Sequence, residues 1–129
     1  MAVLGACTAS DSEVVCAAHW SAPVRIDIAP GLADRVTDVS IRLCRAASCD
    51  EPSVTLLPAR EGAARVGTVS DSVLTAEAVE ATVQVRTDDA APVVSRLTIT
   101  PRRTRRGANC GVDYNAQLHI TDDASVTQP

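Results

Sequence analysis

The sequence of 129 residues has no phenylalanine and only one tryptophan, one tyrosine and one methionine. Valine, leucine, isoleucine and alanine must therefore supply most of the core, and hydrophobic residues still make up 46% of the chain. Charged residues make up 22%, close to the globular average, which excludes a wholly disordered chain. At this length we expect a single domain that can bury a substantial core.

Lysine is also absent, because all twelve basic residues are arginine. This absence excludes Schiff-base or general-base chemistry by a lysine amine. No apolar run reaches about 18 residues, so no transmembrane helix is predicted. The formal net charge is −4, and this acidic balance argues against nucleic acid as a partner.

The dominant pattern is an alternation of apolar and polar residues with a period of two, which is typical of half-buried β-strands. Six segments show it clearly, namely 24–29, 39–44, 54–57, 79–86, 93–100 and 116–121, and two show it weakly, namely 14–18 and 65–69. Turn signals lie between them, including Pro30-Gly31 and a predicted hairpin loop over 88–92. The pattern predicts an all-β fold, an antiparallel β-sandwich of Ig-like architecture with about seven strands.

We expect one β-sandwich domain over residues 13–121. Residues 1–12 form an N-terminal segment in this interpretation, and the polar residues 122–129 form a C-terminal tail that frays. Helical potential is confined to residues 72–79, which could form a couple of turns.

The chain has five cysteines, and this odd number leaves one of them with a separate fate. They are Cys7, Cys16, Cys44, Cys49 and Cys110. A structural zinc site requires two close pairs, and no C-x2-C motif occurs, so no metal site is predicted. Disulfides are favoured over free thiols, which predicts an oxidising, extracytoplasmic compartment.

Without Cys7, four cysteines allow three pairings. Cys44 and Cys49 flank four residues, and the facing positions of such a hairpin bring two Cβ atoms close to disulfide range. The remaining pair would be Cys16 with Cys110, so we expect a domain stabilised by both disulfides.

The segment Leu4-Gly5-Ala6-Cys7 resembles the bacterial lipobox, in which the cysteine becomes the lipidated N-terminus. This resemblance implies lipidation of Cys7 and a membrane lipid anchor. A four-residue match also arises by chance, so an ordinary N-terminal segment is the alternative.

Arginine is concentrated in one stretch, where Arg102, Arg103, Arg105 and Arg106 lie within five residues. Four guanidinium groups in an acidic protein predict a positive patch that binds phosphate, anionic lipid headgroups or an acidic protein partner. The alternative is a solvated loop after the strand at 93–100. Stacking aromatics are missing around the patch, which again disfavours nucleic acid.

The histidines, His19 and His119, are far apart, and no sequence feature places them together as metal ligands. No G-x-S-x-G motif occurs, and neither histidine has an evident serine partner. We predict no catalytic residue, no metal and no cofactor. The competing interpretation is a small-ligand-binding or hydrolytic protein with a cleft near His19, Trp20 and His119.

Three features together resemble a group of small actinobacterial secreted or lipoprotein-like proteins of unknown function. They are the Cys-x4-Cys hairpin from Cys44 to Cys49, the stretch 99–104, and the turn 109–111 before a final strand containing Gln117-Leu118. The resemblance implies a surface location and a disulfide-bonded β-domain, and it implies no activity.

Together these observations predict a non-enzymatic binding or accessory module of the cell envelope, either lipid-anchored through Cys7 or secreted. A purely structural envelope protein is a further alternative.

Overall fold

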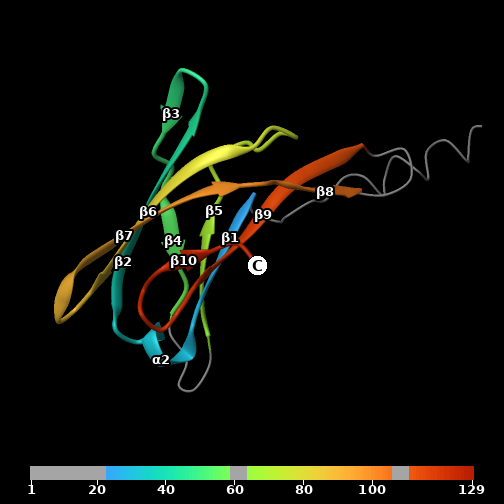
Figure 1. The fold of residues 1–129 in the computed structure, drawn as a ribbon. Helices are drawn as coiled ribbons and strands as arrows, with labels where there is room; N and C mark the ends of the chain where they lie inside the picture. Colours follow the sequence, from blue (N-terminus) through green and yellow to red (C-terminus); the bar gives the residue numbers. More distant parts are fainter. Residues whose placement is uncertain (1–22, 59–63, 106–110) are drawn as a thin grey trace, which may run out of the picture.

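The structure, a computed structural model, describes residues 23–58, 64–105 and 111–129. Within these ranges it contains ten β-strands and one single-turn helix (Figure 1). In chain order they are β1 (Val24–Ile28), α2 (Pro30–Ala33), β2 (Val36–Arg45), β3 (Ser48–Asp50), β4 (Val54–Leu56), β5 (Arg65–Val69), β6 (Val79–Thr87), β7 (Ala90–Ile99), β8 (Arg102–Arg105), β9 (Val112–Ile120) and β10 (Val126–Thr127).

The strands form two sheets around one core. The first sheet has the order β10-β9-β1-β5-β4, with β8 also paired to β9, and the second has the order β3-β2-β6-β7. The predicted all-β fold is confirmed. Both sheets are mainly antiparallel, as expected, although β1 runs parallel to β9. The described residues form ten strands, where about seven were expected.

The core lies between the two sheets and consists of small aliphatic side chains. Val24, Ile26 and Ile28 of β1 are completely buried, and they join one cluster with buried residues of the second sheet such as Val83 and Ile99. None of the described polar or charged residues is buried. Each fully buried valine or isoleucine contributes about 1.5–3 kcal/mol, so many small residues together replace large aromatic anchors.

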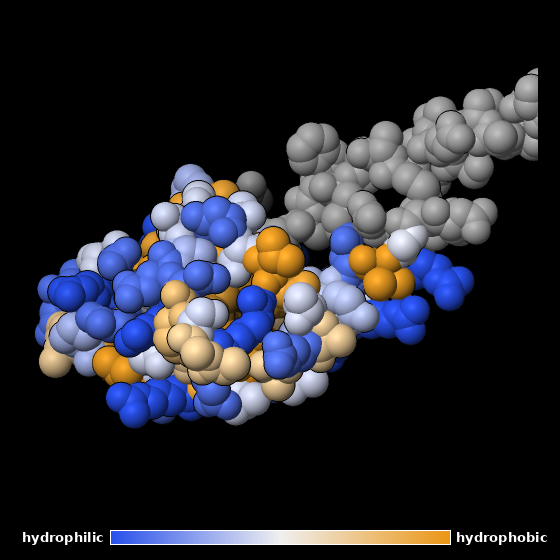
Figure 2. All heavy atoms as spheres, turned by 90° about the horizontal axis from the view of Figure 1, so that it is seen from above, coloured by the Kyte–Doolittle hydropathy of each residue, from blue (hydrophilic) through white to orange (hydrophobic). Residues whose placement is uncertain are grey.

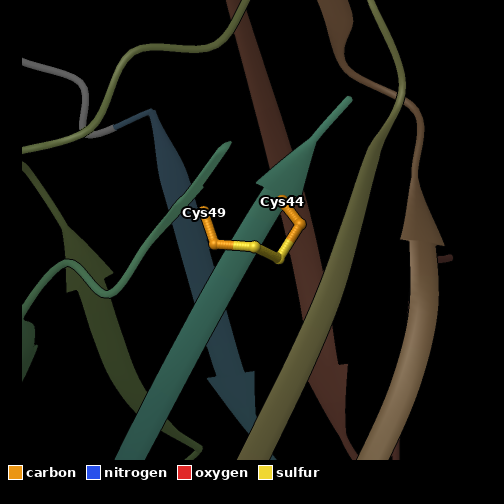
Figure 3. Close-up of a disulfide and its surroundings, with 2 residues drawn as sticks. All are labelled: Cys44 and Cys49. Atoms are coloured by element: carbon orange, nitrogen blue, oxygen red, sulfur yellow. A yellow bond between two sulfur atoms is a disulfide. The ribbon is translucent and has the colours of Figure 1, made fainter. Parts of the chain in front are cut away.

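The β2–β3 hairpin holds the predicted disulfide. Cys44 and Cys49 face each other in the antiparallel register, and their sulfur atoms are bonded (Figure 3). The two-residue turn of this hairpin contains Ala46, which has a left-handed φ of 45°. Because Leu43 is buried and Cys49 is exposed, the disulfide lies on the outward face of the second sheet.

Three local expectations are corrected. Pro30-Gly31 begins the short helix α2 instead of forming a simple turn, because the proline occupies its first turn. Residues 72–79 are not helical, and Leu74 in this segment is buried in the core. The hairpin at 88–92 is present with a shorter turn, because Thr87 already pairs with Ala90.

The C-terminal tail does not fray, which corrects the expectation for residues 122–129. β10 pairs with β9, and the alternating apolar residues Ala124 and Val126 are buried in the core. The side-chain amide of Gln128 accepts a hydrogen bond from the backbone N–H of Thr100 at 2.9 Å and donates one to the backbone carbonyl of Thr100 at 2.8 Å. Apolar burial and these hydrogen bonds together hold the segment against the sandwich.

The turn between β9 and β10 is built around Asp123. Its carboxylate accepts hydrogen bonds from the hydroxyls of Thr121 and Ser125 and from the backbone N–H of Ser125. These bonds favour the charged carboxylate, with the Thr121 hydroxyl as the largest cause, and lower the pKa of Asp123 from 3.8 to about 2.

Several predicted residues lie outside the described ranges. They are Cys7, Cys16, His19, Trp20, Arg106, Cys110 and the weak strand candidate at 14–18. Within the described ranges, no helix has the length and apolar character needed to cross a membrane.

Candidate anion-binding surface on strand β8

The basic stretch forms a strand, which corrects the alternative of a solvated loop for Arg102–Arg105. Strand β7 ends at Ile99, and the chain then leaves the second sheet and pairs with the N-terminal half of β9. Figure 1 shows β8 and the adjoining part of β9 reaching away from the two sheets. We call β8 together with residues 112–115 the basic arm.

One side of the basic arm continues the core-facing side of β9. Ala116, Leu118 and Ile120 are buried, so Val112 and Tyr114 share their side by the period-two alternation of a strand. Arg103 lies opposite Tyr114, and Arg105 lies opposite Val112. Arg103 and Arg105 therefore share one side of the basic arm with the half-buried Tyr114 and Val112.

The other side of the basic arm is polar and includes one acid, Asp113, which lies opposite Thr104. Arg102 lies opposite Asn115 in the register. The side-chain amide of Asn115 donates a hydrogen bond to the Thr104 hydroxyl at 2.9 Å, which ties the two strands together. The arm thus presents arginine on both of its sides.

All four residues of β8 are exposed to solvent. The structure gives two ion pairs between described residues, Arg25–Asp27 and Arg35–Asp89, and neither involves β8. Figure 2 shows strongly hydrophilic side chains gathered at the right-hand end of the described surface. Because guanidinium groups stay charged at any workable pH, the three arginines of β8 keep a positive field available to an anion.

Tyr114 is a member of this surface that sequence analysis does not single out. The alternation of the last strand extends backwards through Val112 and Tyr114, which is the signal that would have found it. Its position opposite Arg103, however, depends on the pairing of β8 with β9.

Of the residues of the alternative catalytic cleft, the structure describes only His119, because His19 and Trp20 lie outside the described ranges. His119 is exposed on the outward face of β9, beside Asp27 of β1 in the register. The Asp27 carboxylate already accepts hydrogen bonds from Arg25, at 3.0 Å, and from Gln117. Among the described residues, no group of three or more histidine, cysteine or acidic side chains could hold a metal ion.

No protein-family model matches this chain, and neither a curated protein nor a solved structure is significantly similar to it. The resemblance to secreted actinobacterial proteins therefore stays a prediction. Any assignment of function has to be made from the chain's own geometry.

Proposed function

We propose that the protein is a non-enzymatic binding or accessory module of the cell envelope that contacts anionic lipid headgroups through its basic arm. The observation that supports this proposal is the exposure of Arg102, Arg103 and Arg105, none of which has a carboxylate partner among the described residues. A guanidinium group offers forked donors that match phosphate oxygens. Each arginine near an anionic membrane surface contributes about 1 kcal/mol, so three strengthen binding by about two orders of magnitude.

The extracytoplasmic location is part of this proposal. The Cys44–Cys49 disulfide is compatible with a compartment in which thiols oxidise. Two or more acyl chains hold a protein firmly to a membrane, because each buried methylene contributes about 0.8 kcal/mol. A lipid anchor on Cys7 would therefore keep the protein at the membrane, where the basic arm would contact the headgroups.

The test is co-sedimentation of the full chain with vesicles of phosphatidylglycerol and phosphatidylcholine. The test variant replaces Arg102, Arg103 and Arg105 with glutamine. We expect it to bind about a hundredfold more weakly than the wild type at low salt, since three headgroup contacts are lost. Binding of the wild type should also fall as the salt concentration rises.

A matched control replaces Arg25, Arg35 and Arg86 with glutamine, which changes the net charge by the same amount. Arg25 and Arg35 already face the carboxylates of Asp27 and Asp89. The control should keep most of its vesicle affinity. Equal losses in both variants, or equal binding to pure phosphatidylcholine, would refute a specific role for the arm.

A further inference from the structure

A second basic feature lies on the outward face of the other sheet. Arg42 of β2 faces Thr82 of β6, and Thr82 in turn faces Arg96 of β7. Both arginines are exposed, and Ile41 and Leu43 on either side of Arg42 are buried. The three residues therefore form an arginine–threonine–arginine row across adjacent strands. With strands about 4.8 Å apart, the two arginine Cα atoms are about 10 Å apart.

The two arginines of this row have no anionic partner among the described residues. In the register, Asp50 of β3 lies opposite Leu43, the neighbour of Arg42, and on the outward face Glu80 lies one row away. Its carboxylate accepts a hydrogen bond from the Thr98 hydroxyl at 2.8 Å and makes no ion pair with Arg42 or Arg96. The positive charges of Arg42 and Arg96 therefore lie on either side of the Thr82 hydroxyl without a counterion. A bound anion would neutralise them.

The row on the other side is uncharged. It consists of Ser40, Gln84 and Val94, with Gln84 half-buried. The Gln84 amide adds hydrogen-bond donors next to the Thr82 hydroxyl, and no carboxylate stands there to repel an anion. The donors of both rows point away from the core on one face of the sheet.

We propose that the Arg42–Thr82–Arg96 row binds a tetrahedral oxyanion, a phosphate or sulfate group of a ligand lying on this face. Each guanidinium can donate to two oxygens, and the Thr82 hydroxyl can donate to another. A carboxylate has only two oxygens and cannot occupy all of these donors. The site is independent of the basic arm, because it lies on the other sheet.

Because Arg42 and Arg96 are exposed to solvent, the expected affinity for an anion is low. The face is a sheet surface with solvent-exposed arginines, and contacts between exposed charges each change an equilibrium by a factor of about five at most. Binding of a single free anion should therefore be weak, with a dissociation constant of roughly 1 mM, and removal of both arginines should weaken it by up to about 25-fold.

The experiment is a titration of the isotope-labelled full chain with inorganic phosphate at constant ionic strength, followed by amide chemical shifts. We expect saturable shifts at Arg42, Thr82, Arg96 and their neighbours. The double variant Arg42→Gln/Arg96→Gln should lose them. The control Arg86→Gln removes a different exposed arginine, which lies on β6 opposite Asp38. This variant should keep the saturable shifts.

Further measurements identify the anion and distinguish this site from the basic arm. Sulfate should reproduce the phosphate shifts, and acetate should bind much more weakly; equal binding of acetate would refute the tetrahedral oxyanion. The glutamine variant of Arg102, Arg103 and Arg105 should still bind phosphate at the row, even though it fails with vesicles. Shifts that do not saturate, that persist in the double variant or that map only to β8 would overturn the proposal. The dispersion of the amide spectrum shows at the same time that each variant is folded.

Discussion

Two alanines hold left-handed backbone conformations, and replacing each with glycine should have different consequences. Ala46, in the β2–β3 turn, has a φ of 45°, and Ala124, before β10, has a φ of 69°. A left-handed conformation costs an L-residue about 1–2 kcal/mol that glycine does not incur. Glycine loses more chain entropy on folding, about 0.5–1 kcal/mol relative to alanine. The difference between these two terms should make either substitution stabilising by about 0.5–1 kcal/mol.

Burial separates the two positions. Ala46 is exposed at the turn, so its methyl group contributes no packing. Ala124 is 4% exposed and belongs to the core cluster, so glycine there also removes a buried methyl group worth about 0.8 kcal/mol. We expect Ala46→Gly to stabilise the oxidised protein by about 0.5–1 kcal/mol and Ala124→Gly to have a net effect close to zero.

Urea unfolding of the two variants beside the wild type measures these differences, provided that the slope m stays constant. The Cys44–Cys49 disulfide must be kept intact in all samples, because it already restricts the unfolded hairpin around Ala46. The reasoning is wrong if Ala46→Gly destabilises the protein, or if Ala124→Gly stabilises it more than Ala46→Gly does.

Three other expectations concern the cysteines and Asp123. Replacing both Cys44 and Cys49 with alanine should lower the unfolding free energy by about 2 kcal/mol, the closure entropy of so short a loop, and an unchanged urea midpoint would contradict this. Because the folded pKa of Asp123 is about 2, below its ordinary value of 3.8, the unfolded state binds more protons between these pH values and stability should rise from pH 2 to pH 4. The Asp123→Asn variant should lack this rise in stability when urea unfolding is measured across the same pH range. A pH profile identical to that of the wild type would contradict the role of the Asp123 carboxylate. Intact mass with and without reductant should reveal two disulfides, the second being Cys16–Cys110, and a single one would refute that pairing.

Much of the sheet structure could be predicted from the sequence, because strands with one buried face alternate strictly in polarity. The segments that became β1, β2, β6 and β7 show this alternation over five or more residues. The strands β8 and β10 escaped prediction, because they are only two to four residues long, and β3 was expected only as the second strand of the Cys44–Cys49 hairpin. Pairing with a neighbour, not local composition, makes each of these segments a strand.

Long-range pairing also explains what the sequence could not predict about the sites. Arginine density alone identified Arg102, Arg103 and Arg105, because they are neighbours in the chain. Arg42 and Arg96 are separated by 54 positions (96 minus 42) and meet in one row only through the register with β6. The parallel pairing of β1 with β9 is equally invisible to local patterns.

The arginines of β8 also protect an edge strand from pairing with another chain. Substitution by glutamine or by glutamate can separate this effect from anion binding. Within the described residues β8 pairs only with β9, so its other side is a free edge. Charged side chains on an edge strand prevent pairing with another chain. Glutamine at Arg102, Arg103 and Arg105 should remove both this protection and the attraction for anionic vesicles.

Glutamate at the same three positions should behave differently, because like-charged carboxylates also repel a second edge. We therefore expect the glutamate variant to stay monomeric in light scattering while losing vesicle binding, whereas the glutamine variant self-associates at high concentration. If the glutamate variant still binds anionic vesicles, the arginines act as edge protection alone and the proposed membrane contact is wrong. If it loses binding as a monomer, self-association cannot explain the loss, and attraction to the headgroups is the remaining cause.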